Sequence, residues 1–85
     1  PIMLLRVRVA DSDLRAVHED LHARDVTILE EDFSRGECVL RAEVPLRKLL
    51  GYAPKLSSLT RGTGLHWCWL DRYAPTLDPR GPNAA

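Results

Sequence analysis

The sequence has few cysteines, few aromatic residues and no long apolar run. Two of its 85 residues are cysteines, and they show no C-x-x-C spacing, which disfavours a disulfide scaffold or a zinc ribbon. No stretch approaches the roughly 18 apolar residues of a membrane-spanning helix, and no secretory leader opens the chain. We therefore expect a cytoplasmic domain with no membrane partner, in which Cys38 and Cys68 are buried, reduced thiols.

The sequence also lacks an excess of charge of either sign. Its 12 basic and 12 acidic residues cancel, but residues 1–43 carry ten acids and six bases, whereas residues 44–85 carry two acids and six bases. Four bases and no acid lie between Pro45 and Gly64. This segment is either a solvated helix face or a local patch that faces phosphate groups, on a domain that is not basic as a whole.

A chain of 85 residues can bury one modest core but not two. The hydrophobic pattern predicts one folded domain over residues 1–73 and a polar, flexible tail over residues 74–85. Because the sequence opens on Pro1 and ends in this tail, we expect it to be a piece of a longer protein.

The order of secondary structure follows from hydrophobic periodicity. Alternating apolar residues predict a strand in "IMLLRVRVA", two strands in "DVTILEEDF" and "GECVLRAEV" joined by a hairpin turn over 34–36, and a last strand in "LHWCWLDRY". Asp11, Ser12 and Asp13 supply capping side chains for a helix that runs to about Arg24. A second helix is expected over 46–59, with a kink or break at Gly51 and Pro54. The order β-α-β-β-α-β predicts an α+β, ferredoxin-like fold: a four-stranded antiparallel sheet with both helices on one face.

The stretch "VLRAEVPLRKLLGYAPKLSSLTRGTG" resembles the C-terminal domain, domain V, of elongation factor G-type translational GTPases. Members of that family carry R-A-E-V-P-L, then G-Y-A, then S-L-T-x-G-x-G, and the resemblance runs from Pro1 to Tyr73 without a gap. It implies a domain that docks on the large ribosomal subunit, near the sarcin–ricin loop and the stalk-base protein, during translocation. It also implies neighbouring domains in the same parent chain. A tetracycline ribosomal protection protein or another paralogue is the nearest alternative.

The resemblance further implies that GTP and Mg²⁺ bind in an upstream domain of the parent. This sequence contains no G-x-x-x-x-G-K-[ST] phosphate loop, so we expect no cofactor, no metal and no catalytic residue in it. The isolated chain should not be an enzyme.

The resemblance also implies that the motif at the end of the second predicted helix lies toward ribosomal RNA. Hydroxyls and backbone N–H groups of a glycine-containing turn can bind phosphate oxygens, and nearby bases add positive charge. The alternative is that the two glycines only end a helix and begin a strand. We predict the following rRNA-contact residues: Lys55, Ser58, Thr60, Arg61, Gly62 and Gly64. The sequence departs from the family at "HARDVT", where Arg24 stands in place of a short arginine run and Val26 in place of its closing glycine, so stalk-base contacts there have weaker support.

Trp67 and Trp69 occupy the positions of the last strand that alternate with Cys68. If Cys68 faces the helices, both tryptophans lie on the open side of the sheet, near Arg6 and Arg8. We predict that these four residues face another domain of the parent chain, with arginine stacked on the rings. Two alternatives are a base-stacking RNA platform, which lacks the expected aromatics on the first and third strands, and a reversed register that buries the tryptophans.

The segment "HEDLH" has the spacing of the H-E-x-x-H zinc-protease signature, with His18 and His22 as ligands. A third ligand would have to come from Glu30, Glu31, Glu37, Glu43 or His66, and the available carboxylates are expected on the far side of the sheet. We therefore predict a solvent-facing histidine pair without catalytic zinc. No G-x-S-x-G nucleophile elbow is present. Acylphosphatases and small-ligand regulatory modules share the predicted fold, so a stand-alone open-sheet RNA-binding or small-ligand module remains the alternative from another class.

Overall fold

The computed structural model describes residues 1–73, and the predicted tail over 74–85 lies outside the described residues. The element order β-α-β-β-α-β is confirmed, with two short 3₁₀ helices added after β1 and β3. The elements are β1 (Ile2–Ala10), η1 (Asp11–Asp13), α1 (Leu14–Ala23), β2 (Thr27–Ser34), β3 (Glu37–Pro45), η2 (Leu46–Leu49), α2 (Tyr52–Thr60) and β4 (Leu65–Arg72).

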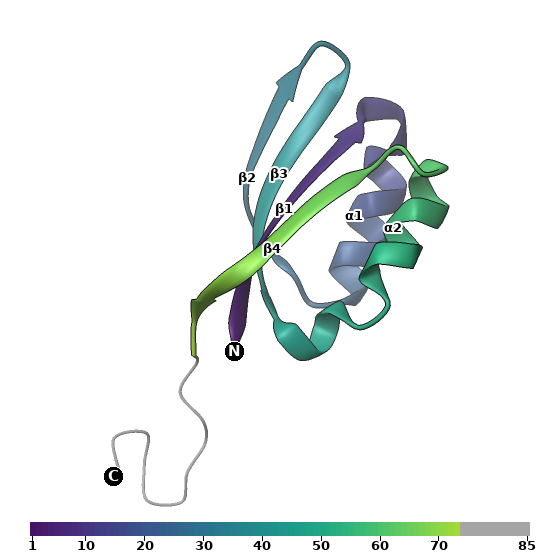
Figure 1. Ribbon diagram of the computed structural model, residues 1–85. Helices are drawn as coiled ribbons and strands as arrows, with labels where there is room; N and C mark the ends of the chain where they lie inside the picture. Colours follow the sequence, from purple (N-terminus) through teal and green to yellow (C-terminus); the bar gives the residue numbers. More distant parts are fainter. Residues whose placement is uncertain (74–85) are drawn as a thin grey trace, which may run out of the picture.

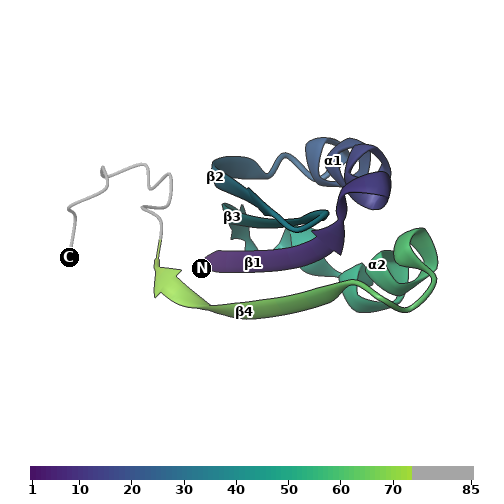
Figure 2. The same cartoon turned by 90° about the horizontal axis from the view of Figure 1, so that it is seen from above.

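The four strands form one antiparallel sheet in the order β2-β3-β1-β4. Both helices lie against one face of this sheet, and the other face is open (Figures 1 and 2). The predicted ferredoxin-like α+β fold is therefore confirmed. The outer strands of the sheet are β2 and β4.

The core lies between the helices and the covered face of the sheet. Alternation along β1 and β3 sends every second residue toward α1 and α2, and these side chains are buried. Burying each large aliphatic side chain stabilises the fold by about 1.5–3 kcal/mol. The buried apolar residues are Leu5, Val7, Val9, Val17, Leu21, Cys38, Leu40, Ala42, Val44, Tyr52 and Leu56.

The predicted hairpin between β2 and β3 is confirmed. Arg35 has φ 53° and Gly36 has φ 77°, so both residues of the two-residue turn lie in the left-handed region. Turns of this kind match the right-handed twist of the strands they join. The hairpin keeps β2 and β3 in register and leaves β2 as the sheet edge.

The capping prediction for α1 is wrong. Asp11, Ser12 and Asp13 form the 3₁₀ helix η1, and no side chain of this segment caps α1. The N-cap residue Asp13 has φ −96° and ψ −7°, which is helical rather than the extended geometry from which a side chain reaches back to the helix N–H groups. The Asp13 side chain is instead buried and lies 3.6 Å from Arg61 Nη2.

The predicted break in the second helix is confirmed at one of its two expected positions. Gly51 has φ 70°, a left-handed conformation that separates η2 from α2. Pro54 does not interrupt α2, because it is the third helical residue, where the backbone N–H has no partner within the helix.

Arg24 connects the end of α1 to the segment between η2 and α2. Its Nη1 donates to the backbone oxygens of Lys48 (2.8 Å) and Leu50 (3.0 Å), and its Nε lies 2.9 Å from Asp20 Oδ2. The guanidinium carbon lies 5.1 Å from the centre of the Tyr52 ring. This arginine is therefore occupied by internal contacts, which agrees with the weaker sequence support for stalk-base contacts at this end.

The outer strand β4 is exposed along its whole length, so the prediction that Cys68 is buried is wrong. The cause is the short α2. The ring centre of its first residue, Tyr52, lies 5.7 Å from that of His66 near the start of β4. The far end of β4 extends past the helix (Figure 2). Partial burial still raises the pKa of the Cys68 thiol. Cys38, on β3, is fully buried as predicted.

We predict that replacing Arg24 with alanine lowers the free energy of unfolding by about 2 kcal/mol or more, because two backbone oxygens and Asp20 lose a charged partner. Urea denaturation measures this change. Arg15→Ala is the control, since Arg15 is exposed on the same helix and makes no ion pair with any of residues 1–73; it should change stability by less than about 0.5 kcal/mol. Equal effects of the two substitutions would contradict the assigned role.

Candidate functional site

The turn between α2 and β4 ends the helix with two left-handed residues. Arg61 has φ 53° and Gly62 has φ 82°, and the N–H groups of both donate to the backbone oxygen of Ser57, at 2.8 Å for Gly62. The Thr63 N–H donates to the Thr60 oxygen at 3.1 Å. The last carbonyl oxygens of α2 are thus capped by backbone N–H groups of the turn itself. The left-handed conformation at position 62 favours glycine there.

Thr60 links the last turn of α2 to the first residues before β4. Its side chain is fully buried, its Oγ1 donates to the Leu56 oxygen at 2.8 Å, and the same oxygen accepts a hydrogen bond from the Gly64 N–H at 2.8 Å. A Cβ at position 64 would lie 2.8 Å from Thr60 Oγ1 and 3.0 Å from Thr60 Cγ2. Gly64 is therefore required by close packing rather than by its dihedral angles.

These contacts correct two parts of the predicted site. The Thr60 side chain cannot contact a partner because it is buried, so its role is to position the turn. The N–H groups of Gly62, Thr63 and Gly64 already bond within the domain, so the expectation that these N–H groups bind phosphate is wrong. Any contact made by the turn must therefore come from its side chains.

The exposed side chains of this region are polar or positively charged. Lys55 and Ser58 are exposed and lie three residues apart, on one side of α2. The Arg61 side chain is 79% exposed and lies 3.6 Å from Asp13 Oδ1, a separation longer than a good hydrogen bond. Within the described residues, Lys55 makes no ion pair at all. The surface thus presents two accessible cations, Lys55 and Arg61, beside a serine hydroxyl.

The open face of the sheet carries both tryptophans, as predicted from alternation. Trp67 lies opposite Arg6 and Trp69 opposite Leu4 in the pairing of β4 with β1. The Arg6 guanidinium carbon lies 5.2 Å from the centre of the Trp67 ring, which is a cation–π contact. Because Cys68 faces the helices, the alternative register that would bury the tryptophans is wrong.

Arg8 does not stack on either tryptophan. It lies opposite Leu65 and forms a two-point pair with Glu37, with distances of 2.8 Å from Nη2 to Oε1 and 3.3 Å from Nε to Oε2. These hydrogen bonds raise the pKa of Arg8 and lower the pKa of Glu37. Arg8 therefore shares the open face with the indoles, as predicted, but the stacking contact is made by Arg6.

Carboxylates pair with arginines across much of the same open face. Arg41 Nη1 lies 2.6 Å from Glu30 Oε2, and Arg72 Nη2 lies 2.8 Å from Glu43 Oε2. Most of the charges on this face are thus paired, while the middle of β4 presents Trp67 and Trp69 beside Arg6 of β1. The outward positions of β1 and β3 hold no aromatic residue, so the structure adds nothing to the base-stacking alternative.

The "HEDLH" histidines do not form a metal site with other side chains of residues 1–73, where no group of three potential ligands comes together. His18 Nε2 lies 2.8 Å from Glu31 Oε1 without the alignment of a good hydrogen bond. The expectation that the carboxylates all lie beyond the sheet is wrong for Glu31, because the β2–β3 register shifts between Ile28 and Glu30. The histidine at position 18 therefore links α1 to β2.

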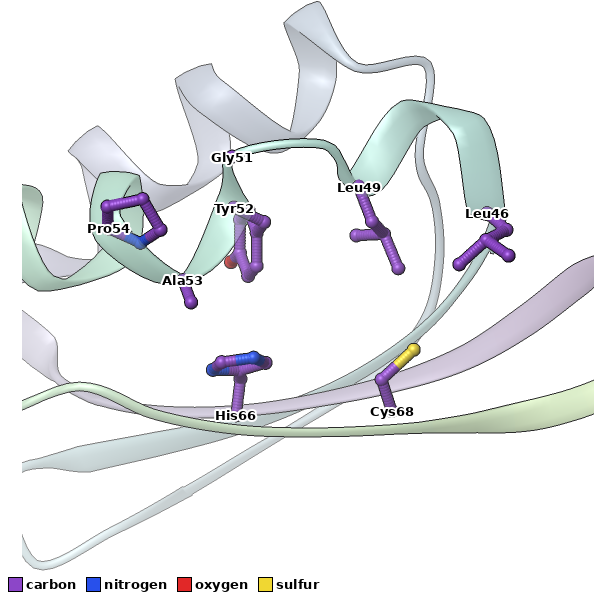
Figure 3. A pocket seen from close by; sticks show the side chains of 8 residues that line it. All are labelled: Leu46, Leu49, Gly51, Tyr52, Ala53, Pro54, His66 and Cys68. Atoms are coloured by element: carbon purple, nitrogen blue, oxygen red, sulfur yellow. The ribbon is translucent and has the colours of Figure 1, made fainter.

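An apolar pocket of about 310 Å³ lies between β4 and the segment that runs from η2 into α2. His66 and Cys68 point into it from β4, and Leu46 and Leu49 face them from η2 (Figure 3). The side chain of Tyr52 forms part of the wall, and its hydroxyl has no hydrogen-bond partner among residues 1–73. Burial and the nearby charge of Asp20 raise the pKa of Tyr52, and Arg24 opposes the shift.

Fold, turn and open face together define a ferredoxin-like α+β domain that presents basic side chains on α2 and at its C-cap. Residues 1–80 match the family model described as "Elongation factor G C-terminus". The chain belongs to this family. No helix of residues 1–73 is long and apolar enough to cross a membrane.

Named relatives agree with this assignment. The chain is 35% identical over 75 residues to elongation factor G 2 of Bdellovibrio bacteriovorus, covering 88% of this chain and 11% of the relative. It is 36% identical over 77 residues to mitochondrial elongation factor G of Drosophila grimshawi (91% and 10%), and 35% identical over 75 residues to mitochondrial ribosome-releasing factor 2 of Danio rerio (88% and 10%). The chain thus spans about a tenth of the length of these relatives.

A solved structure shows the same architecture. A crystal structure of a protein from Thermus thermophilus superimposes with a TM-score of 0.82 at 34% sequence identity. The match covers 94% of this chain and 12% of that chain.

We predict that Gly64→Ala lowers the free energy of unfolding by about 1–3 kcal/mol, because the added methyl group meets the buried Thr60 side chain. Urea denaturation measures the change, and Ser58→Ala, at an exposed position of the same helix, should stay within about 0.5 kcal/mol. The cost should shrink when Thr60→Ala removes the two nearest atoms. Equal costs in both backgrounds would contradict the packing argument.

We predict that stability falls above pH 10 in a way that depends on Tyr52. Burial raises the pKa of Tyr52 in the folded chain, so its contribution to the free energy of unfolding is complete below the pKa of about 10 that tyrosine has in an unfolded chain. As the pH rises further, this contribution is lost by up to about 1.4 kcal/mol per pH unit. Denaturant titrations from pH 8 upward should show a shallower decline for Tyr52→Phe than for the wild type. Parallel curves would contradict the assignment.

Proposed function

We propose that this chain is the ribosome-docking C-terminal domain of an elongation factor G-type translational GTPase. The observation that carries the proposal is the match of residues 1–80 to the elongation factor G C-terminus family. In this proposal the parent protein is cytoplasmic and acts in translocation, and its GTP and Mg²⁺ bind in an upstream domain. The chain by itself has no cofactor and no GTPase activity.

The proposed contact lies at the C-terminal end of α2 and faces large-subunit rRNA near the sarcin–ricin loop and the stalk base. Phosphate oxygens account for most protein contacts that position a domain on nucleic acid, and they attract lysine and arginine. Lys55 and Arg61 supply the charge, Ser58 supplies a hydroxyl, and Gly62 lets the RNA approach without a side chain in the way. Thr60 and Gly64 keep this turn in one shape, through the hydrogen bond between them.

The open sheet face is proposed to contact another domain of the same parent chain. Trp67 and Trp69 are 43% and 46% exposed, which is a large apolar surface for a free domain. Arg6 stacks on Trp67, and Arg8 extends the face with its Glu37 pair. The relatives are about ten times longer than the matched region, so the parent has ample chain to cover this surface.

A paralogue of the factor is the second candidate. The similarity to mitochondrial ribosome-releasing factor 2 of Danio rerio is at the same level as the similarity to elongation factor G 2. A tetracycline ribosomal protection protein would share the same docking domain. The turn and its charges support ribosome docking equally in each case.

We predict that the chain protects the sarcin–ricin loop or the stalk base of large subunits from chemical cleavage. Arg61→Gln should weaken binding and lower the slope of log affinity against log salt by about 1, as expected for the loss of one phosphate contact. Trp67→Ala should leave the footprint unchanged. The charge-matched control is Arg35→Gln, at the β2–β3 hairpin, which should leave the salt slope unchanged.

Two results would contradict this proposal. Protection that survives Arg61→Gln together with Lys55→Gln but disappears in Trp67→Ala would move the contact to the sheet face. Protection of neither rRNA element at low salt would remove the support for docking by this turn.

A further inference from the structure

Asp13 is the one charged residue that is buried among residues 1–73. Its side chain is 7% exposed, and no group of the described residues donates a hydrogen bond to its carboxylate. Burying a charged group is unfavourable unless the charge is paired and hydrogen-bonded. The partners that stabilise this carboxylate therefore act through charge, at longer range than a hydrogen bond.

Two sources of positive charge lie near Asp13. The residue directly precedes α1, and the N-terminal end of a helix dipole favours a negative charge. The second source is Arg61, the C-cap residue of α2, whose Nη2 lies 3.6 Å from Asp13 Oδ1. The start of α1 and the end of α2 lie at the same end of the domain (Figure 1), and within residues 1–73 Asp13 forms no other ion pair. A buried carboxylate thus lies beside one of the two cations proposed to contact RNA.

The contact between the two side chains is too long to orient Arg61. A guanidinium carries five N–H donors in a fixed fork, so an aspartate that accepted one short hydrogen bond from it could direct the others toward a phosphate. At 3.6 Å, and with the Arg61 side chain 79% exposed, no such hydrogen bond holds the fork in place. The attraction between opposite charges is what remains, and it acts whichever way the guanidinium points.

We infer that Asp13 is an affinity-determining residue of this turn, because its carboxylate competes with an RNA phosphate for Arg61 and weakens the contact. An exposed acid can turn away from an approaching phosphate and is screened by salt, whereas a buried carboxylate is held in place and is screened much less. Lys55, which forms no ion pair within residues 1–73, meets no such competitor. The identity of the anion, an rRNA phosphate, rests on the proposed function, whereas the competition rests on the geometry of the pair.

The size of the effect follows from the distance between the two anions. A carboxylate and a phosphate that share one guanidinium lie roughly 6–8 Å apart, and their repulsion across a partly hydrated surface weakens binding by about three- to tenfold. The negative end of the α2 dipole, at which Arg61 lies, acts in the same direction. Arg61 therefore binds phosphate more weakly than an unpaired arginine would, and its contact is more easily released.

The test compares the affinities of the wild-type chain, Asp13→Asn, Arg61→Gln and the double variant for two probes at one low salt concentration. The probes are large ribosomal subunits and a fluorescent oligouridylate. Asp13→Asn keeps the shape of the side chain and removes its charge, so it should bind both probes about three- to tenfold more tightly. In the Arg61→Gln background the same substitution should change the affinity by less than about twofold, because the cation for which the two anions compete is gone.

The two probes separate the role of Asp13 from the proposed function, because oligouridylate carries phosphates without the fold of rRNA. Asp11→Asn is the matched control. It removes the same charge from an exposed residue of η1 that forms no ion pair within residues 1–73, and its affinity should stay within about twofold of the wild type. Tighter binding of Asp13→Asn to oligouridylate alone would support the competition and count against ribosome docking.

Four results would overturn the role of Asp13: no tightening on either probe, weaker binding of Asp13→Asn, an equal gain for Asp11→Asn, or a full gain in the Arg61→Gln background. If Arg61→Gln still weakens binding to large subunits in any of these cases, the proposed RNA contact stands without the competition. If circular dichroism shows that Asp13→Asn does not fold, Asp13→Ser removes the same charge and takes its place.

Discussion

The buried hydroxyl of Thr60 makes the hydrogen bonds on which the turn between α2 and β4 depends. It donates to the Leu56 oxygen and accepts from the Gly64 N–H, both at 2.8 Å, and so joins the last turn of α2 to the start of β4. A buried polar atom is costly unless it is bonded, and this one is bonded on both sides. The same contact sets the shape of the turn, the direction in which Arg61 leaves it, and the point at which β4 enters the sheet.

A turn that satisfies its own backbone has a simple chemical consequence. Its N–H groups already bond within the domain, so the proposed RNA contact would use the side chains of Lys55, Ser58 and Arg61. Side chains of this kind position a domain on an RNA backbone and contribute a salt-dependent affinity. The chain is neutral overall, and the segment from Pro45 to Gly64 carries four bases and no acid.

Most of the fold could be predicted from the sequence because its signals are local. Alternation gave the strands and the correct face for Trp67, and the left-handed positions of Arg35, Gly36 and Gly51 fall where turns were expected. Features that depend on distant residues could not be predicted in this way. Arg24 reaches backbone oxygens 24 and 26 positions away. Cys68 is exposed because α2 is too short to cover β4, which no pattern within β4 reveals.

In the candidate site, too, local features could be predicted from the sequence and contacts between distant residues could not. Exposure of Lys55, Ser58 and Arg61 follows from helical spacing and charge, whereas the burial of Thr60 is visible only from the packing of α2 against the sheet. The Asp13 carboxylate beside Arg61 comes from the start of α1, so no local motif could reveal it. The contact of Glu31 with His18 depends on a register shift in β2, which moves one carboxylate to the helix side.

Amide hydrogen exchange of the turn tests most directly whether its backbone is satisfied from within. The N–H groups of Gly62, Thr63 and Gly64 should exchange slowly in the free chain, because each is hydrogen-bonded inside the domain. Thr60→Val keeps the shape of the side chain but removes its oxygen, and it should abolish the protection of Gly64 while leaving that of Gly62 in place. Exchange of all three at the rate of unstructured amides in the wild type would contradict this account.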